Sequence, residues 1–357
     1  MLLNDTIARI EPPIRSAEMA ACRHQEALAI PRGSLGRLHE IAIRMAAITG
    51  DTRPEVNSTS IITMAGDHGV AAQGVSCFPQ EVTCEMVANF ARGGAAINVL
   101  ADVFDSRLTV VDIGVAGQPN YGESTPGGNC RLVNARIAEG TADIARGPAM
   151  TRDQAKAAVN TGIRVFIEEY SKGLDAVGTG DMGIANTTPS AAIASALLGC
   201  SPEKVVNRGT GIDDNALAHK VSVVERSLEI NRPDPEDALD LLSKVGGFEI
   251  GGISGVILAA CAHRTPIVVD GFISTAAAML ASRFNPHVKQ YLFSGHQSAV
   301  AGHDLMLADL EIVPLVNLGM RLGEGTGAAF GLAVLKAASR VACRVLTFDE
   351  ARVTGPG

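Results

Sequence analysis

Short apolar runs, most of them ending in glycine and polar residues, recur along the chain from about residue 60 onward. Alanine-rich stretches with helical character separate them. Near-continuous apolar strands that alternate with helices are typical of a parallel β-sheet covered by helices on both faces. We therefore predict an α/β fold with six parallel strands, at residues 61–65, 108–111, 176–177, 267–269, 291–293 and 312–318.

The first 50 residues have a different pattern. Leu38, Ile41 and Met45 recur at the three- and four-residue spacing of one helix face, which predicts helices rather than strands. The segment 117–129 is rich in Gly, Pro, Asn and Ser, and it predicts a loosely structured loop.

Composition excludes several classes of protein. The 357 residues are 46% hydrophobic, which is enough for one large domain with or without a small satellite. A net charge of −8 argues against a nucleic-acid surface. Seven scattered cysteines form no CxxC pair, and the N-terminus has no signal-peptide pattern. No apolar stretch is long enough to cross a bilayer, so we expect a soluble, cytoplasmic protein.

Three carboxylates stand just after predicted strands, where open parallel sheets bind their ligands. Asp181 and Asp270 are of a type that commonly caps turns. Glu324 is different, because glutamate is a poor turn former and here stands among Gly323, Gly325 and Gly327. Glycines let the backbone approach a ligand closely. Glu324 is therefore our candidate for proton transfer to a buried small molecule.

Two glycine-rich segments suggest phosphate sites. Residues 178–183 match the dinucleotide pattern GxGxxG, but the next helix-start signal comes several residues later, at 186–189. The helix start at Asn186, Thr187 and Thr188 suits a monophosphate, although an ordinary capped helix has the same pattern.

The second glycine-rich segment is 208–211, of sequence RGTG, with Lys220 further along a predicted helix. Backbone amides together with an ammonium group suit a phosphate, whereas Lys220 alone is as readily a surface residue. The GxxxxGK[ST] loop of nucleoside triphosphatases is absent from the chain, so triphosphate hydrolysis is not expected.

The histidines and serines do not form familiar catalytic patterns. His68, His296 and His303 lack the HExxH spacing of a zinc site, and we expect them to anchor loops by hydrogen bonds. Ser76 and Ser298 lack the GxSxG elbow of serine hydrolases. We therefore expect neither a metal nor covalent serine catalysis.

Several segments together resemble one family, the nicotinate-nucleotide–dimethylbenzimidazole phosphoribosyltransferases of the cobalamin lower-ligand pathway. The matching segments occur in order and span residues 33–328, so the resemblance covers nearly the whole chain. They are 33–38 (GSLGRL), 65–70 (AGDHGV), 74–76 (GVS), 79–83 (PQEVT), 180–188 (GDMGIANTT), 208–211 (RGTG), 270–272 (DGF) and 322–328 (LGEGTGA).

The resemblance implies transfer of phosphoribose from nicotinate mononucleotide to 5,6-dimethylbenzimidazole, giving α-ribazole 5′-phosphate and nicotinate. It implies a homodimer that needs no cofactor and binds small molecules rather than nucleic acid or membrane. Each chain would have a large catalytic domain at residues 51–324, with a Rossmann-like sheet of six parallel strands and helices on both faces. A small helical domain would be assembled from residues 1–50 and 325–357.

By the same resemblance, Glu324 is the general base. Asp181 stands where we expect glutamate and is a candidate supporting carboxylate, whereas Val300 stands where we expect an acidic residue. Leu322, Met182, Phe78 and Pro79 are candidates for an apolar slot that takes the dimethylated ring. The predicted substrate-binding residues are Ser76, Phe78, Pro79, Gln80, Met182, Gly183, Asn186, Thr187, Thr188, Gly209, Thr210, Gly211, Lys220, Asp270, Gly271, Ser298 and Leu322.

The chemistry of this transfer agrees with the residues present. Nicotinate leaves as a neutral ring, so the leaving group needs neither a metal nor a strong general acid. The incoming azole must lose a proton, which a carboxylate can accept. Two other functions stay open: an NAD-dependent oxidoreductase that uses residues 178–183, and a non-catalytic nucleotide- or azole-binding protein. The preferred base is also open, because methyl groups are worth only about 1–3 kcal/mol in discrimination.

Overall fold

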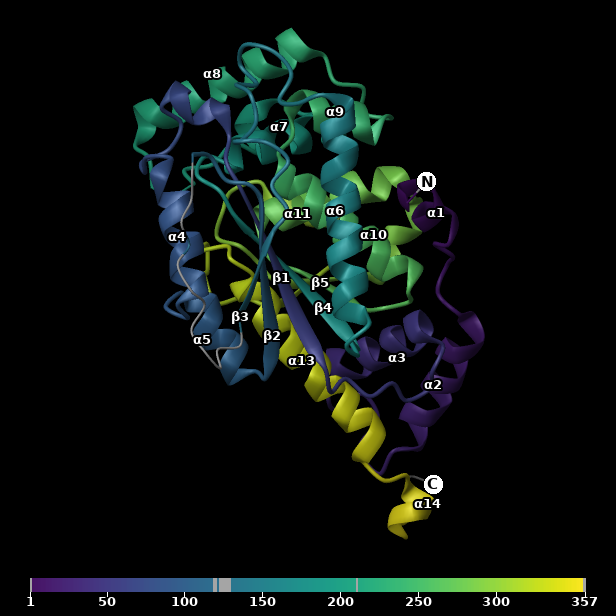
Figure 1. The fold of residues 1–357 in the computed structure, drawn as a ribbon. Helices are drawn as coiled ribbons and strands as arrows, with labels where there is room; N and C mark the ends of the chain where they lie inside the picture. The colour runs from purple at the N-terminus through teal and green to yellow at the C-terminus, as the bar shows by residue number, and fades with distance from the viewer. Residues whose placement is uncertain (1, 118–120, 122–129, 210, 356–357) are drawn as a thin grey trace.

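The computed structural model describes residues 2–117, 121, 130–209 and 211–355. Its centre is one sheet in which every strand pair is parallel (Figure 1). The strands are β1 (Thr59–Gly66), β2 (Ser106–Gly114), β3 (Cys130–Asn134), β4 (Ala176–Met182), β5 (Ile267–Val269), β6 (Leu292–His296) and β7 (Pro314–Val316). Their order across the sheet is β3-β2-β1-β4-β5-β6-β7, so the direction of winding reverses between β1 and β4. A reversal of this kind opens a crevice beyond the carboxyl ends of those two strands.

The predicted parallel sheet is confirmed, with seven strands in place of the predicted six. The additional strand is β3, which pairs with β2 at one edge of the sheet. In its sequence, CRLVN, only two adjacent residues are strongly apolar, and its side chains are half-buried or exposed. An edge strand of this kind lacks the continuous apolar run on which the prediction rested.

Helices cover both faces of the sheet. On one face lie α6 (Arg152–Tyr170), α10 (Phe248–Ala262) and α11 (Phe272–Phe284); on the other lie α5 (Ala96–Val103) and α13 (Thr326–Arg344). The strands are therefore buried on both sides, which explains their apolar sequences. Further helices are α4 (Glu81–Ala91), α7 (Thr187–Leu198), α8 (Asp214–Asn231), α9 (Ala238–Val245) and α12 (His303–Asp309).

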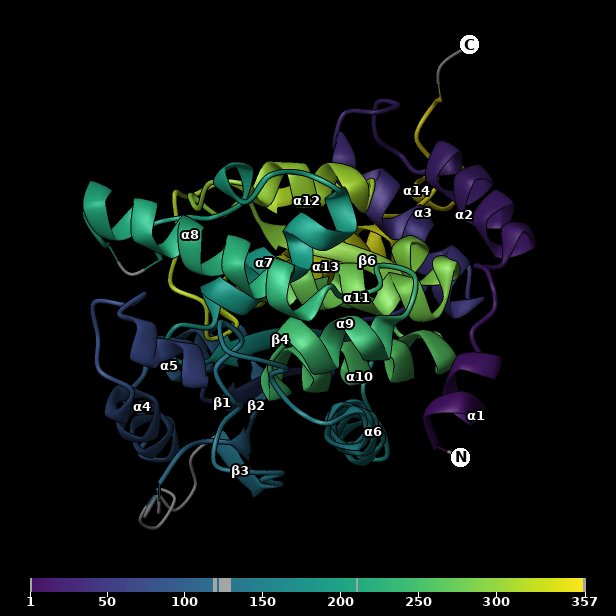
Figure 2. The same cartoon turned by 90° about the horizontal axis from the view of Figure 1, so that it is seen from above.

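Helices α6 and α10 pack side by side at very short range (Figure 2). A Cβ atom at Gly162 of α6 would lie 1.8 Å from the carbonyl oxygen of Gly252 in α10. A Cβ at Gly255 of α10 would lie 2.0 Å from the carbonyl oxygen of Val159. Only glycine permits so close an approach of the two backbones at these positions.

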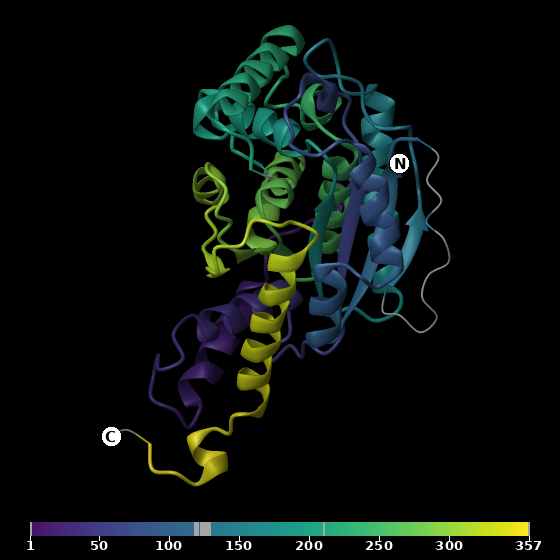
Figure 3. The same cartoon turned by 90° about the vertical axis from the view of Figure 1, so that its left-hand side faces the viewer.

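N-terminal helices, drawn in purple, lie beside the C-terminal half of α13, drawn in yellow, whereas the first residues of the chain lie far from the C-terminus (Figure 3). The predicted N-terminal helices are present as α1 (Leu2–Ala8), α2 (Arg15–Ala27) and α3 (Arg37–Thr49). Helix α3 packs against α13, and Leu28 forms an antiparallel bridge with Thr347, next to α14 (Phe348–Ala351). The first part of α13 covers the sheet, so this helix belongs to both regions. A division into two domains stays a prediction.

Most of the predicted loop at 117–129, namely 118–120 and 122–129, lies outside the described residues. In the described part of the chain, no helix combines the length and the apolar character needed to cross a bilayer.

Candidate active site

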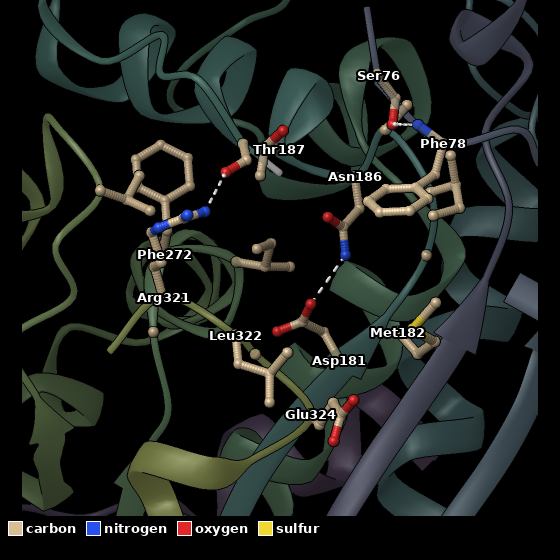
Figure 4. A pocket seen from close by; sticks show the side chains of 18 of the residues that line it. Ser76, Phe78, Asp181, Met182, Asn186, Thr187, Phe272, Arg321, Leu322 and Glu324 are labelled. Carbon is tan, nitrogen blue, oxygen red and sulfur yellow. Dashed lines mark hydrogen bonds between the residues drawn. The ribbon is translucent and has the colours of Figure 1, made fainter. Parts of the chain in front are cut away.

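A cavity of about 350 Å³ opens beyond the carboxyl ends of the strands, at the reversal of the sheet (Figure 4). Its walls come from segments that are far apart in the chain, from residue 75 to residue 324. Among the predicted site residues, it brings together Ser76, Phe78, Asp181, Met182, Gly183, Asn186, Thr187, Gly209, Gly271, Ser298, Leu322 and Glu324.

Glu324 lies in this cavity wall and is only 5% exposed. Its carboxylate Oε2 accepts the backbone N–H of Ile97, at the start of α5, over 3.3 Å. Burial raises the pKa of Glu324, and the Ile97 N–H opposes that rise by stabilising the charged form. The carboxylate is therefore shielded from bulk water yet held by a helix N-terminus, as a general base for a buried ligand would need.

The backbone of Glu324 is fastened on two sides. Its N–H donates to the carbonyl of Asp181 over 3.1 Å, and its carbonyl accepts the hydroxyl of Thr63 over 2.7 Å. Its φ of 64° lies in the left-handed region, which non-glycine residues seldom adopt. A Cβ at Gly180 would lie 2.4 Å from the Glu324 carbonyl oxygen. Gly180 is thus required for the close approach of this loop to β4.

The Asp270 carboxylate also fixes the loop that carries Glu324. Its buried carboxylate accepts backbone N–H groups from Gly325 at 3.0 Å, Gly327 at 2.6 Å and Ala328 at 3.2 Å, at the start of α13. Helix N-termini favour a carboxylate in this position. Asp270 was predicted to bind substrate; the structure places it beneath the cavity wall, where it supports the segment that carries Glu324.

Asp181 is the second carboxyl group of the cavity. It lies near the end of β4, and its Oδ2 accepts the side-chain amide of Asn186 over 2.9 Å. Burial raises the pKa of Asp181 to about 7, the Asn186 bond opposes the rise, and the charges of Glu249 and Glu324 add to it. Near neutral pH the Asp181 carboxyl therefore exchanges a proton. When it is protonated, the cavity does not hold negative charges on both Asp181 and Glu324.

One end of the cavity is polar. Thr187 begins α7, whose dipole favours an anion at this end, although the Thr188 N–H already donates to the Ala185 carbonyl over 2.9 Å and Pro189 has no N–H. The buried Lys220 ammonium donates to Thr187 Oγ1 over 2.6 Å and to the Asn207 carbonyl over 3.2 Å. Burial lowers the pKa of Lys220 to about 8. Arg321 lines the same end and donates to the Gly209 carbonyl over 3.4 Å.

The opposite side is mainly apolar. Phe78 and Met182 lie there together, across the cavity from Thr187 and Arg321 (Figure 4). The other apolar lining residues of the cavity are Val75, Val82, Met86, Ile184, Ala185, Phe272, Ile273, Val300 and Leu322.

Histidines anchor the neighbouring loops. His303 Nδ1 accepts the N–H of Ser298 over 3.0 Å, while its Nε2 lies 2.9 Å from the hydroxyl of Thr275. Burial lowers the pKa of His303 to about 3, so the ring is neutral and can serve as acceptor. His68 forms a buried pair with Glu249 at 3.0 Å, a partner that the sequence did not reveal. Among the described residues, no group of three His, Cys, Asp or Glu side chains could hold a metal ion.

Some predicted residues do not reach the cavity wall. Pro79 and Gln80 precede α4, and Thr188 is buried within α7. Gly211 lines an adjoining hollow, and Lys220 lies behind Gly209, where a Cβ would be 3.5 Å from its ammonium. Thr210 lies outside the described residues.

Other lining residues were missed by the sequence reasoning. Val82 and Met86 are four residues apart on α4, so one face of that helix forms the wall. The helical spacing was visible in the sequence, but nothing in it showed which face α4 would present. Arg321 is three residues before Glu324 in the sequence, and this proximity could have identified it as a candidate site residue.

The GxGxxG segment at 178–183 does not form a dinucleotide cradle. A Cβ at Gly178 would meet Ala328 and Leu332 at 3.1 Å, and Gly180 is in contact with the Glu324 backbone. These glycines accommodate the start of α13 rather than a pyrophosphate. The observation removes the structural basis for the NAD-dependent oxidoreductase.

Comparisons with known proteins agree on one family. A phosphoribosyltransferase family model matches residues 10–353. The nicotinate-nucleotide–dimethylbenzimidazole phosphoribosyltransferase of Desulforudis audaxviator is 49% identical over 99% of this chain and 98% of its own length. That of Geobacter sulfurreducens is also 49% identical, over the same shares of both chains.

The structural comparison gives the same result. The crystal structure of CobT from Thermus thermophilus superposes with a TM-score of 0.90 at 40% identity, over 96% of this chain and all of the other. The chain therefore belongs to the nicotinate-nucleotide–dimethylbenzimidazole phosphoribosyltransferase family.

Proposed function

We propose that the protein transfers the phosphoribosyl group of nicotinate mononucleotide to 5,6-dimethylbenzimidazole, in assembly of the nucleotide loop of cobalamin. The products are α-ribazole 5′-phosphate and nicotinate. The single observation that carries this proposal is the buried Glu324 carboxylate in the wall of a largely apolar cavity. Membership of the family supports it.

The proposed step is a single displacement at C1′ of the ribose. One azole nitrogen attacks C1′ while the bond from C1′ to the nicotinate ring nitrogen breaks, and its electron pair neutralises the pyridinium. The other azole nitrogen gives its proton to the Glu324 carboxylate. Attack from the face opposite the leaving ring converts the β-nucleotide into an α-riboside. Holding both rings in line across the ribose contributes through orientation.

The polar end of the cavity suits the phosphate of the nucleotide. The Thr187 hydroxyl accepts a hydrogen bond from the Lys220 ammonium and keeps its own proton to donate, the dipole of α7 favours an anion there, and the ammonium stands directly behind Gly209. Backbone N–H groups and a nearby cation are the usual elements of a phosphate site. Arg321 supplies a second positive charge at the same end.

Asp181 is proposed as a supporting carboxyl. It shares the cavity with Glu324, and because burial raises its pKa to about 7 it exchanges a proton near neutral pH. A pair of carboxyls with unlike environments can divide the roles of proton donor and acceptor.

The site of action that we propose is the cytoplasm, because all seven cysteines are free thiols in the structure. We also propose a homodimer, for which exposed apolar side chains on α5 and before α13 provide support. The remaining alternative is a non-catalytic protein that binds the same molecules. A measurement of turnover distinguishes this alternative from the enzyme.

The test is the variant Glu324→Gln, which keeps the shape of the side chain but cannot accept a proton as a carboxylate does. We expect kcat to fall by about 10²–10⁴-fold, the usual contribution of a general base. Binding of nicotinate mononucleotide, measured by titration calorimetry, should stay within about twofold of wild type. The measurement is nicotinate release and α-ribazole 5′-phosphate formation, followed by chromatography.

The matched control is Glu229→Gln, on the exposed face of α8, which should retain full activity. Unchanged turnover in the Glu324 variant would remove that residue as the base. Absence of nicotinate release by the wild-type protein, with the azole present, would leave the non-catalytic alternative.

A further inference from the structure

Thr83 joins two elements that each form part of the cavity wall. It lies on α4 and is fully buried. Its hydroxyl donates to Oδ1 of Asp67 over 2.6 Å and accepts the backbone N–H of Ile184 over 3.0 Å. A single hydroxyl group thus connects α4, the end of β1 and the segment that follows β4.

Asp67 is a fixed point on the sheet. Its N–H donates to the carbonyl of Gly114 over 2.9 Å, and its carbonyl accepts the N–H of Thr141 over 2.9 Å. Its second carboxylate oxygen, Oδ2, accepts the N–H of Ala116 over 2.8 Å. Because Asp67 is fixed to the sheet, the Thr83 hydroxyl holds both α4 and Ile184 at a fixed place relative to the sheet.

The segment 182–186 needs such support. It lies between the end of β4 and the start of α7, and it contains Ala185 at the unfavourable φ of 70°. It also presses on β1, since a Cβ at Gly183 would lie 2.2 Å from the carbonyl oxygen of Gly66. Met182, Gly183, Ile184 and Ala185 all line the cavity.

Helix α4 provides the adjoining part of the wall. Val82 and Met86 line the cavity on either side of Thr83 in the sequence. The hydroxyl of Thr83 is thus the contact between two apolar surfaces whose separation fixes the width available to a flat ring. Phe78 and Met182 mark this apolar side, away from the polar end at Thr187 (Figure 4).

We propose that Thr83 is a positioning residue that sets the width of the slot for the incoming aromatic base. It touches neither substrate, and it acts through Ile184, Val82 and Met86. This inference rests on the proposed function, because it assigns the apolar side of the cavity to the azole. It predicts an effect on the azole and little effect on the nucleotide, whose phosphate lies at the opposite end.

The test compares Thr83→Val with Thr83→Ser. Valine has the shape of threonine but leaves the Ile184 N–H and Oδ1 of Asp67 without the hydrogen bonds that the Thr83 hydroxyl made, which drives the two surfaces apart. We expect kcat/KM for dimethylbenzimidazole to fall by about tenfold or more, while KM for nicotinate mononucleotide stays within about twofold. Serine keeps both hydrogen bonds and should restore the azole kinetics to near wild type.

The control is Thr59→Val, at the opposite end of β1. Thr59 is also buried, and its hydroxyl shares a 2.7 Å hydrogen bond with Ser106. This variant should lose thermal stability as Thr83→Val does, with no change in either KM. If Thr83→Val fails to fold, Thr83→Ala carries the test, because the smaller side chain leaves the backbone groups accessible to water. Direct titration with dimethylbenzimidazole measures binding without turnover.

Three outcomes would overturn the inference. If the wild type turns over and Thr83→Val or Thr83→Ala keeps its azole kinetics, the positioning role is wrong and the proposed function stands. A parallel rise of both KM values in Thr83→Val would indicate general loosening and would likewise refute it. If the wild type releases no nicotinate, the proposed function is wrong, and the role of Thr83 falls with it.

Discussion

Several residues that line the cavity have a backbone conformation or a buried charge that is unfavourable on its own. Glu324 has a left-handed backbone and a buried carboxylate, and Asp181 has a buried carboxyl with a raised pKa. Both states are stabilised from outside, by the Asp270 carboxylate beneath one loop and by the Asn186 amide beside Asp181. Strain and buried charge concentrate at functional sites because the surrounding fold compensates for them.

Asp181 should make stability depend on pH. Burial raises its pKa to about 7 from 3.8, so folding takes up a proton between these values. The stability that the neutral carboxyl contributes is complete below about pH 3.8 and is lost as the pH rises through about 7. Asp181→Asn cannot ionise at this position. As the pH rises from 5 to 8, its unfolding free energy relative to that of the wild type should therefore increase by about 2 kcal/mol or more.

Urea unfolding of both proteins at several pH values would measure this difference. Asp304→Asn, on the exposed start of α12, is the control and should show a difference from wild type that does not change with pH. A pH-independent difference for Asp181→Asn would contradict the raised pKa.

At the scale of the elements, the sequence predicted the buried parts better than the edges. Six strands were predicted from continuous apolar runs, and each is present in the sheet. The edge strand β3 was missed because its apolar run is only two residues long and none of its side chains is fully buried. The helix start near Thr187 was predicted from its residue types, which are determined locally. The contact between α6 and α10 depends on glycines that are distant in the chain, so it could not be predicted.

The α6–α10 contact gives a prediction about stability. Gly162→Ala would place a methyl group 1.8 Å from the Gly252 carbonyl oxygen, so the helices must separate. Overpacking of this kind costs about 1–3 kcal/mol of unfolding free energy, or more where backbones clash. Thermal or urea unfolding measures the loss. Gly147→Ala is the control, because nothing lies within 4 Å of its Cβ position, and equal stability of the two variants would contradict the packing argument.

At the scale of the whole molecule, the site depends on the sheet topology. The winding reverses between β1 and β4, and residues from 75 to 324 meet beyond the strand ends there. The sequence placed Glu324 and Asp181 at strand ends, and the cavity brings them together. The sequence could not show that Asp270 lies beneath the cavity wall, or that the side of α4 with Val82 and Met86 faces the cavity. Those positions depend on how elements pack across long distances in the chain.

The proposed homodimer is tested at this scale. Val99 and Val103 are 59% and 65% exposed and lie four residues apart on α5, so they share one outward face. Light scattering should give the wild-type protein twice the mass of one chain. Replacing both valines by aspartate should reduce the measured mass to that of a single chain, because charges in an apolar interface are costly. A single-chain mass for the wild type would refute the dimer.

Helix α13 has a consequence for how the protein is made. It directly follows Glu324, covers the central strands, and continues to the N-terminal helices. A ribosome delivers residues in order, so nearly the whole sheet emerges before the helix that shields one of its faces. Until α13 emerges, the part of that face that α5 does not cover stays exposed to solvent, and Glu324 is not yet held in the cavity wall. Closure of this part of the interior and formation of the site therefore occur together, when α13 folds onto the sheet.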